Sequence, residues 1–228
     1  LQLQSMLRRV ASERVAPRAN DIDRTAAYPE DMFELLCELG LFALPFPEAH
    51  GGTGSLVSAC LAIEELGTVC YNTAYLLAVQ WTPFGAILAG GTEEQKQRLL
   101  PDLASGKMRA AISITEPQSG SDVRGITTKA ERSVDGYRLN GAKAWCTGAS
   151  VSDYIFVAAK TGEGNSTANV DLFRVPTNAS GLVIGRKEDK MGARGIPSHP
   201  LFLDDVVVPE NDRLGGEQAG GFKLVMEA

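Results

Sequence analysis

The sequence predicts an α+β protein, with an all-α N-terminal domain, then a β-barrel-like or two-sheet domain, then the start of a further helix. Three observations support this. Apolar residues recur with helical spacing through the first hundred residues, and from Arg109 the pattern changes to short runs rich in Val, Ile and Phe between turns. Residues 220–228 again look like the first turns of a helix. We therefore expect domains at residues 1–108, 109–215 and 216–228.

The composition is that of a globular protein and excludes several classes. Of 228 residues, 44% are hydrophobic and 22% charged, and the net charge is −6 without a basic stripe, which argues against nucleic-acid binding. No apolar run reaches the roughly 18 residues of a membrane span. Four cysteines have no metal or redox spacing, which favours a reducing compartment, and we expect Cys37 and Cys60 to be small core residues.

Helices are expected over 31–39, 56–66 and 73–88, the last broken or capped near Pro83. Thr92 and Gln95 have the spacing of a capping box, in which a hydroxyl caps the helix and the residue three positions on reaches back. That box predicts a fourth helix, which runs to about Ala104.

The β region begins with a predicted hairpin. Residues 129–134 and 137–139 flank an Asp-Gly turn at 135–136, and Asn140-Gly141 predicts a second turn. Further short strands are expected over 154–159, 170–175, 182–185 and 201–208. Short strands with regular turn signals favour a barrel or two packed sheets over βαβ units.

One stretch, Ala111 to Thr147, combines a strand-like run, the turn segment TEPQSGSD at 115–122 and, after the hairpin, Trp145-Cys146-Thr147. This combination resembles the flavin-binding middle domain of the acyl-CoA dehydrogenase family, whose signature reads TEPxxGSD followed by NGxKxWIT. The resemblance extends over essentially the whole chain. It departs from the family at Cys146, where Ile is frequent, and at Gly148-Ala149, where Asn-Gly is frequent.

The resemblance implies a site for FAD. Trp145 would pack over the flavin rings, Thr147 would bond near N5, and Cys146, alternating away from both, would be a packed thiol. Glycine lets the backbone amides of Gly120 and Ser121 approach a phosphate, and the Ile114-Thr115 strand end offers groups to the pyrimidine edge. Glu116 suits a structural role in the turn. The expected FAD residues are Ile112, Ile114, Thr115, Gly120, Ser121, Trp145 and Thr147.

The resemblance indicates the substrate-binding residues less directly than the FAD-binding residues. In the family the acyl chain enters between the flavin and helices that align with 73–88. The candidates are Tyr75, Ala78, Val79, Thr82 and Ser121. Helix-face packing explains the four helical residues equally well. The histidines, His50 and His199, are interpreted as surface or loop residues without a catalytic partner.

The resemblance implies α,β-dehydrogenation of an acyl-CoA to the trans-2-enoyl-CoA. The family's catalytic base is a glutamate of a C-terminal helical bundle, beyond Ala228, so no catalytic residue is expected in this chain and the chain alone is expected to be inactive. Electron-transfer flavoprotein or a similar acceptor, a homotetramer, and a bacterial cytoplasmic or mitochondrial matrix location are also implied. The alternatives are an acyl-CoA oxidase, an acyl-carrier-protein dehydrogenase, a flavin monooxygenase relative, or a non-catalytic flavin-binding subunit.

Overall fold

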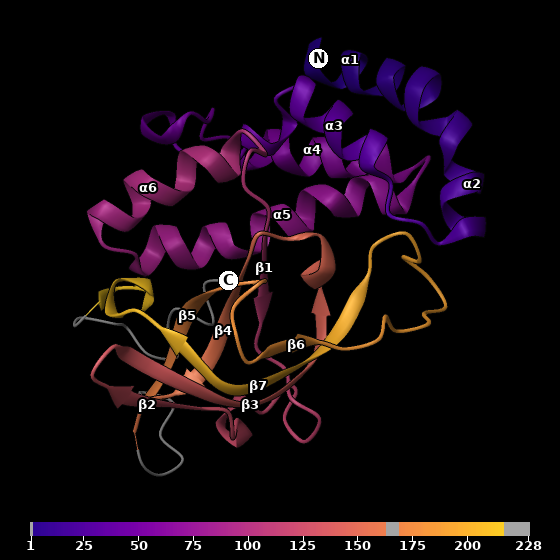
Figure 1. Ribbon diagram of the computed structural model, residues 1–228. Coiled ribbons are helices and arrows are strands. Elements are labelled where there is room, and N and C mark those ends of the chain that lie inside the picture. The colour runs from indigo at the N-terminus through magenta and orange to yellow at the C-terminus, as the bar shows by residue number, and fades with distance from the viewer. Residues whose placement is uncertain (1, 163–168, 217–228) are drawn as a thin grey trace. The chain divides into compact units, whose positions relative to one another are not determined.

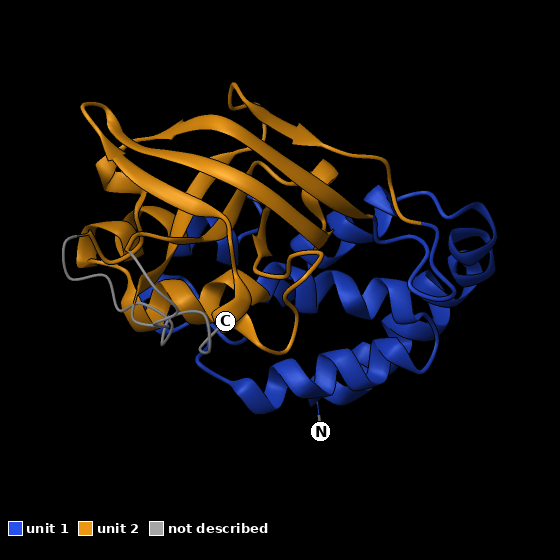
Figure 2. Cartoon of the chain, turned by 90° about the horizontal axis from the view of Figure 1, so that it is seen from below, with its two compact units in different colours: residues 1–81, 100–108, 189–197 blue, residues 82–99, 109–188, 198–228 orange. Residues whose placement is uncertain are grey.

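A computed structural model describes residues 2–162 and 169–216. The chain divides into two compact units, coloured separately in Figure 2, and each is described by itself. The first unit holds residues 1–81, 100–108 and 189–197, and the second holds 82–99, 109–188 and 198–228. The helix expected at 220–228 lies outside the described residues. Among those residues, no helix is both long enough and apolar enough to cross a membrane.

The helices come first in the chain (Figure 1). They are α1 (Gln2–Val10), α2 (Ala16–Thr25), α3 (Glu30–Glu38), α4 (Leu56–Gly67), α5 (Tyr71–Gly90) and α6 (Glu93–Ala104), with a π-helical turn, Ala11–Val15, joining α1 to α2. Helices α3 and α4 confirm two of the predictions. The sequence pattern did not predict α1 and α2, because the buried positions of these helices and of the turn between them are few and lie among many charges: Leu7, Ala11, Val15 and Ile22.

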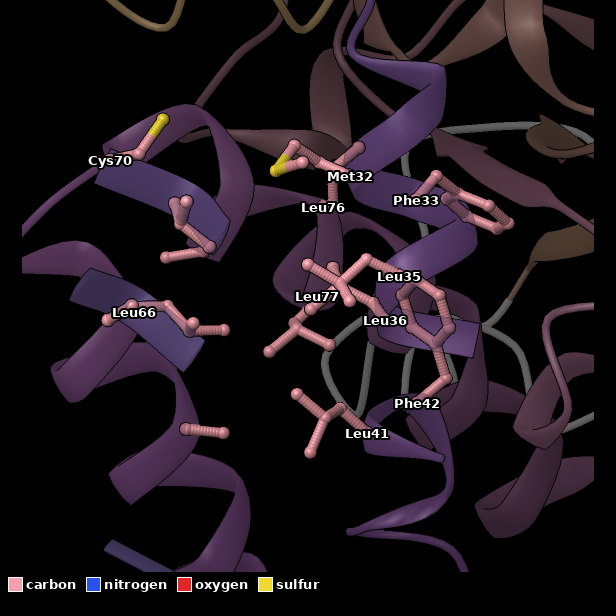
Figure 3. Packing of buried hydrophobic residues seen from close by; sticks show 14 of the residues in the cluster. Met32, Phe33, Leu35, Leu36, Leu41, Phe42, Leu66, Cys70, Leu76 and Leu77 are labelled. Atoms are coloured by element: carbon pink, nitrogen blue, oxygen red, sulfur yellow. The ribbon is translucent and has the colours of Figure 1, made fainter. Parts of the chain in front are cut away.

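A hydrophobic core holds the helices of the first unit together. Figure 3 shows side chains from α3, α4 and α5 meeting, with Leu36, Leu66 and Leu77 fully buried. The rings of Phe33 and Phe42 pack with centroids 4.7 Å apart. Helices of this length are marginal alone, so this burial rather than intrinsic propensity stabilises them.

Two details of the helices differ from the prediction. Helix α5 is not broken at Pro83, which lies inside it and is buried. A proline in a helix interior removes one backbone hydrogen bond, yet α5 continues past Pro83 to Gly90. Cys60 is exposed, because α4 buries the face that contains Ala59, Ala62 and Leu66.

The capping box of α6 is confirmed atom by atom. The backbone N–H of Gln95 donates to Thr92 Oγ1 at 3.2 Å, and the N–H of Thr92 donates to Gln95 Oε1 at 3.0 Å. Two amides that the first helical turn leaves without partners are thereby satisfied.

The β region forms one seven-stranded mixed sheet. Its strands are β1 (Ala110–Ser113), β2 (Lys129–Ser133), β3 (Gly136–Thr147), β4 (Tyr154–Lys160), β5 (Val170–Pro176), β6 (Leu182–Ile184) and β7 (Ser198–Val208). The order is β1-β4-β2-β3-β7-β6, with β5 antiparallel to β4. The long strands β3 and β7 curl together in Figure 1, so the sheet is a half-barrel, and the predicted fold class is confirmed.

The Asn140-Gly141 turn was predicted wrongly. These residues lie within β3, at a bulge where its pairing with β7 shifts register. Gly141 has φ +154°, and a Cβ there would lie 2.7 Å from Thr128 Cα, so the glycine is needed for a close approach of backbone and not for a turn. The hairpin before it is confirmed, although its loop is 134–135, one residue earlier than expected.

Candidate functional site

Trp145 stands out in the second unit. Between Lys143 and Cys146, β3 departs from its regular pairing with β7. Trp145 occupies this irregularity with φ +59°, a conformation that costs free energy in a bulky residue, and its side chain is 57% exposed. The sheet therefore holds a large aromatic face toward solvent at a local energetic cost. Strain of this kind concentrates at functional sites.

Thr147 lies two residues further along β3 and is half-buried. It pairs in register with Ser198 of β7, and the two hydroxyl oxygens are 3.2 Å apart. The Thr147 hydroxyl also lies 3.4 Å from the carbonyl oxygen of Trp145. An exposed aromatic surface and a hydroxyl group are thus held next to each other on one strand.

Cys146 separates these two residues and is buried, as expected. Burial raises the pKa of its thiol to about 12, so the thiol stays protonated and unreactive at neutral pH. Opposite it in β7, His199 is buried and not a surface or loop residue, which corrects the prediction. Its ring nitrogens lie 2.8 Å from the Gly185 carbonyl oxygen and 2.9 Å from Ser150 Oγ.

Behind the strand lies a buried ion pair between Lys143 and Glu116, with Nζ and Oε1 2.8 Å apart and both side chains fully buried. Glu116 also accepts backbone N–H groups from Thr127 at 2.7 Å and Thr128 at 3.0 Å. Burial raises the pKa of Glu116, but the Lys143 charge and the hydrogen bonds outweigh it and lower that pKa to about 2. Burial lowers the pKa of Lys143 to about 8.

The ion pair joins the segments of the sequence motif. Lys143 Nζ also donates to the carbonyl oxygen of Ile114 at 3.1 Å, at the end of β1. The N–H of Ala144 donates to the carbonyl oxygen of Thr115 at 2.9 Å, so the irregular part of β3 is bonded to the start of the turn. Ile114 and Ile112 are both half-buried. Thr115 and Trp145 are therefore brought together by neighbouring backbone.

The loop after Glu116 is a tight turn followed by an open segment. Glu116 and Ser119 exchange two backbone hydrogen bonds, at 2.8 and 3.1 Å, and Ser119 Oγ donates to the Asp122 carbonyl oxygen at 2.6 Å. Gly120 and Ser121 are exposed, and nothing lies within 4 Å of where a Gly120 Cβ would stand. The loop thus has a fixed base and an accessible tip.

The candidate substrate residues of α5 share one helix face, since 75, 78, 79 and 82 are spaced i, i+3, i+4 and i+7. All four are partly buried. Tyr75 stacks on Tyr71 with ring centroids 5.4 Å apart. Thr82 belongs to the second unit, as Ser121 does, and the other three belong to the first.

Two residues of this site were not singled out from the sequence. The sequence could have indicated Lys143, because a lysine at an inward position of a strand needs a buried partner for its charge. No feature of the sequence indicated Ser198, because its contact with Thr147 joins residues 51 positions apart.

Comparisons with known proteins agree with the geometry. Residues 1–107 match the model of the acyl-CoA dehydrogenase N-terminal domain, and residues 111–206 match that of the acyl-CoA dehydrogenase middle domain. The chain therefore belongs to the acyl-CoA dehydrogenase family, which confirms the resemblance.

Three similar proteins illustrate the relationship. The probable acyl-CoA dehydrogenase YngJ of Bacillus subtilis is 40% identical over 227 residues, covering 97% of this chain and 59% of YngJ. Butyryl-CoA dehydrogenase from Megasphaera elsdenii superposes with a TM-score of 0.90 at 31% identity, over 99% of this chain and 61% of that one. A glutaryl-CoA dehydrogenase from Mycobacterium smegmatis in complex with FADH2 superposes with a TM-score of 0.88 at 28% identity, over 99% of this chain and 57% of that one. This chain thus spans about three-fifths of the length of these relatives.

Proposed function

We propose that this chain provides the FAD-binding part of an oxidoreductase that catalyses α,β-dehydrogenation of an acyl-CoA thioester to the trans-2-enoyl-CoA. The observation that carries the proposal is Trp145, held exposed in a strained conformation beside the Thr147 hydroxyl. The names of the similar dehydrogenases support the reaction, and the complex with FADH2 supports the cofactor.

The residues present fit FAD. A flavin requires a flat apolar surface, hydrogen-bonding groups beside its ring and donors for its pyrophosphate. Trp145 supplies an exposed aromatic face, and Thr147 and Thr115 supply hydroxyl groups. Gly120 and Ser121 form an exposed loop tip. A phosphate can approach the backbone closely there, because Gly120 has no side chain and nothing lies within 4 Å of where its Cβ would stand. Ile112 and Ile114 offer half-buried apolar and backbone groups.

In the proposed mechanism, FAD when bound supplies the two-electron acceptor for oxidation of the thioester. This chain's residues bind and orient it: Trp145 covers the rings, Thr147 places a hydroxyl at their edge, and the loop tip holds the phosphates. The face of α5 that contains Tyr75, Ala78, Val79 and Thr82 is proposed to line the acyl chain, with Ser121 near the thioester. The base that removes the α-proton is proposed to be a glutamate of a C-terminal helical bundle, and no residue of this chain is proposed for that role.

The remaining expectations stay proposals. We infer domains at residues 1–108, 109–215 and 216–228, a homotetrameric assembly, and electron-transfer flavoprotein or a similar acceptor as the redox partner. A bacterial cytoplasmic location is preferred to the mitochondrial matrix.

The test is an anaerobic titration of the full-length protein with acyl-CoA thioesters of increasing chain length, followed by the visible flavin absorption band. Bleaching by one of them supports the proposal. A flavin spectrum that no thioester bleaches would contradict dehydrogenation and leave a non-catalytic flavin-binding role. Rapid reoxidation of the bleached protein by oxygen would indicate an oxidase on the same fold.

A further inference from the structure

The inference concerns Ser198, the first residue of β7, which is 3% exposed. Its hydroxyl lies 3.2 Å from that of Thr147. The next residue, His199, has both ring nitrogens within hydrogen-bonding distance of neighbours, at 2.8 and 2.9 Å. These contacts hold β7 in place next to Ser198, and because Ser198 pairs in register with Thr147, its hydroxyl lies beside that of Thr147 on the same face of the sheet.

The hydrogen-bonding capacity of Thr147 depends on this neighbour. A hydroxyl has one proton to donate and two lone pairs to accept with, whereas the Trp145 carbonyl oxygen, 3.4 Å from Thr147 Oγ1, only accepts. When Ser198 donates to Thr147, the Thr147 proton is available to a group in front of the strand. When Thr147 donates to Ser198 or to the carbonyl oxygen, Thr147 presents a lone pair to that group instead.

We propose that Ser198 is a positioning residue that lets the Thr147 hydroxyl act as donor or as acceptor toward the redox group in front of Trp145. The proposal rests on the proposed function, since it requires FAD to bind there. A flavin ring nitrogen accepts a hydrogen bond when oxidised and donates one when reduced, so a partner able to do both serves both states. Without the Ser198 hydroxyl, no side chain donates to the Thr147 oxygen from β7, so the hydrogen bond that Thr147 donates to the oxidised state loses the polarisation of a hydrogen-bond chain and is weakened.

The test compares Ser198→Val with Ser198→Thr in the full-length protein. The two side chains have nearly the same shape, but valine has a methyl group where threonine has a hydroxyl. The dissociation constant of the apoprotein for oxidised FAD is measured by fluorescence titration, and the midpoint potential of the holoprotein by equilibration with a redox dye. The threonine variant is expected to match the wild type in both.

The valine variant is expected to bind oxidised FAD about three- to tenfold more weakly than the threonine variant, as for one lost hydrogen bond. Because the reduced state keeps its acceptor, the midpoint potential should rise by about 14–30 mV, the same factor converted for a two-electron couple. A merely structural role for Ser198 would not move the potential in this direction.

Equal affinities and equal potentials in the two variants would overturn the proposal and leave the proposed function intact. Failure of the wild type to bind FAD would overturn both. If the valine variant does not fold, Ser198→Ala against the wild type repeats the comparison without a branched side chain, with the same results expected.

Discussion

The ammonium group of Lys143 lies 2.8 Å from a carboxylate oxygen of Glu116, and neither side chain reaches solvent. Removing two charges from water is costly, so such a pair adds little stability compared with an apolar pair, but breaking it leaves one buried charge without a partner. Since Lys143 lies in β3 and Glu116 in the turn after β1, the pair fixes the turn that precedes Gly120 and Ser121 against the strand that contains Trp145.

The first prediction concerns loss of one partner. Lys143→Met should lower the free energy of unfolding by about 3–5 kcal/mol, because it leaves the Glu116 carboxylate buried without its cation. The double variant Lys143→Met/Glu116→Gln should be less destabilised than the sum of the two single variants, since neither charge remains. Urea unfolding followed by circular dichroism measures both.

A matched control is the exposed pair that Arg124 forms with Asp122, at 2.7 Å. Arg124→Gln should leave the urea midpoint unchanged, because exposed pairs are screened by water. If Lys143→Met were as harmless as Arg124→Gln, the buried pair would not hold this part of the fold.

The second prediction concerns how the stability of the folded protein depends on pH. The pKa of Glu116 is about 2 in the folded protein, against 4.5 for the free side chain, so between these pH values the unfolded chain binds more protons than the folded one. The stability from ionised Glu116 is therefore fully present above about pH 4.5 and is lost as the pH falls toward 2. The stability difference between wild type and Glu116→Gln, measured in urea at several pH values, should shrink over this window. A constant difference would contradict the lowered pKa.

Much of this architecture could be predicted from the sequence, since local patterns govern it. The apolar period predicted α3 and α4, and the Thr92–Gln95 spacing predicted the cap of α6. The motif 115–122 with 145–147 predicted which segments form the candidate site. The conformation of Trp145 could not be predicted, because tryptophan does not favour a left-handed backbone. It results from the register shift between β3 and β7.

Contacts between residues far apart in the sequence, and close approaches of backbone segments, could not be predicted from the sequence either. Asn-Gly usually marks a turn, so the bulge at Asn140-Gly141 was misinterpreted, and only the position of Thr128 explains the glycine. The contact of Ser198 with Thr147 joins residues 51 positions apart, and their pairing follows two register shifts between β3 and β7 that the sequence did not reveal.

The third prediction separates stability from cofactor binding at Trp145. Trp145→Gly should leave the free energy of unfolding of the apoprotein unchanged or raise it by about 1 kcal/mol, because glycine adopts φ +59° without the strain of a bulky residue. The same variant should bind FAD roughly 5- to 150-fold more weakly, as for about 1–3 kcal/mol of lost aromatic stacking. Thermal unfolding of the apoprotein and a fluorescence titration with FAD give the two values.

Ala26 provides the control for this prediction. It ends α2 in the same left-handed conformation, with φ 55°, far along the chain from the candidate site. Ala26→Gly should stabilise the protein as a helix C-cap glycine does and leave FAD affinity unchanged. Equal FAD affinity in the Trp145→Gly variant would remove Trp145 from the proposed site.

The last prediction concerns Gln95, whose side chain does more than close the capping box. Its Nε2 donates to the carbonyl oxygens of Asn211 at 3.0 Å and Arg213 at 2.8 Å, and its Oε1 accepts from the N–H of Gly215 at 2.9 Å. The start of α6 is thereby bonded to the segment that follows β7, more than a hundred residues later. One buried amide thus stabilises two distant pieces of backbone.

Gln95→Ala should therefore cost about 2–4 kcal/mol, from several hydrogen bonds worth roughly 0.5–1.5 kcal/mol each. Thr92→Ala, which removes only the cap hydroxyl, should cost about 1 kcal/mol. Hydrogen–deuterium exchange locates the effect. In Gln95→Ala the amides of 210–216 should exchange faster while those of β3 stay protected, because the segment opens locally before the sheet unfolds. In Thr92→Ala the 210–216 amides should exchange as in the wild type, since the bonds from Gln95 to that segment remain. Equal exchange in the two variants would show that Gln95 acts only as a helix cap.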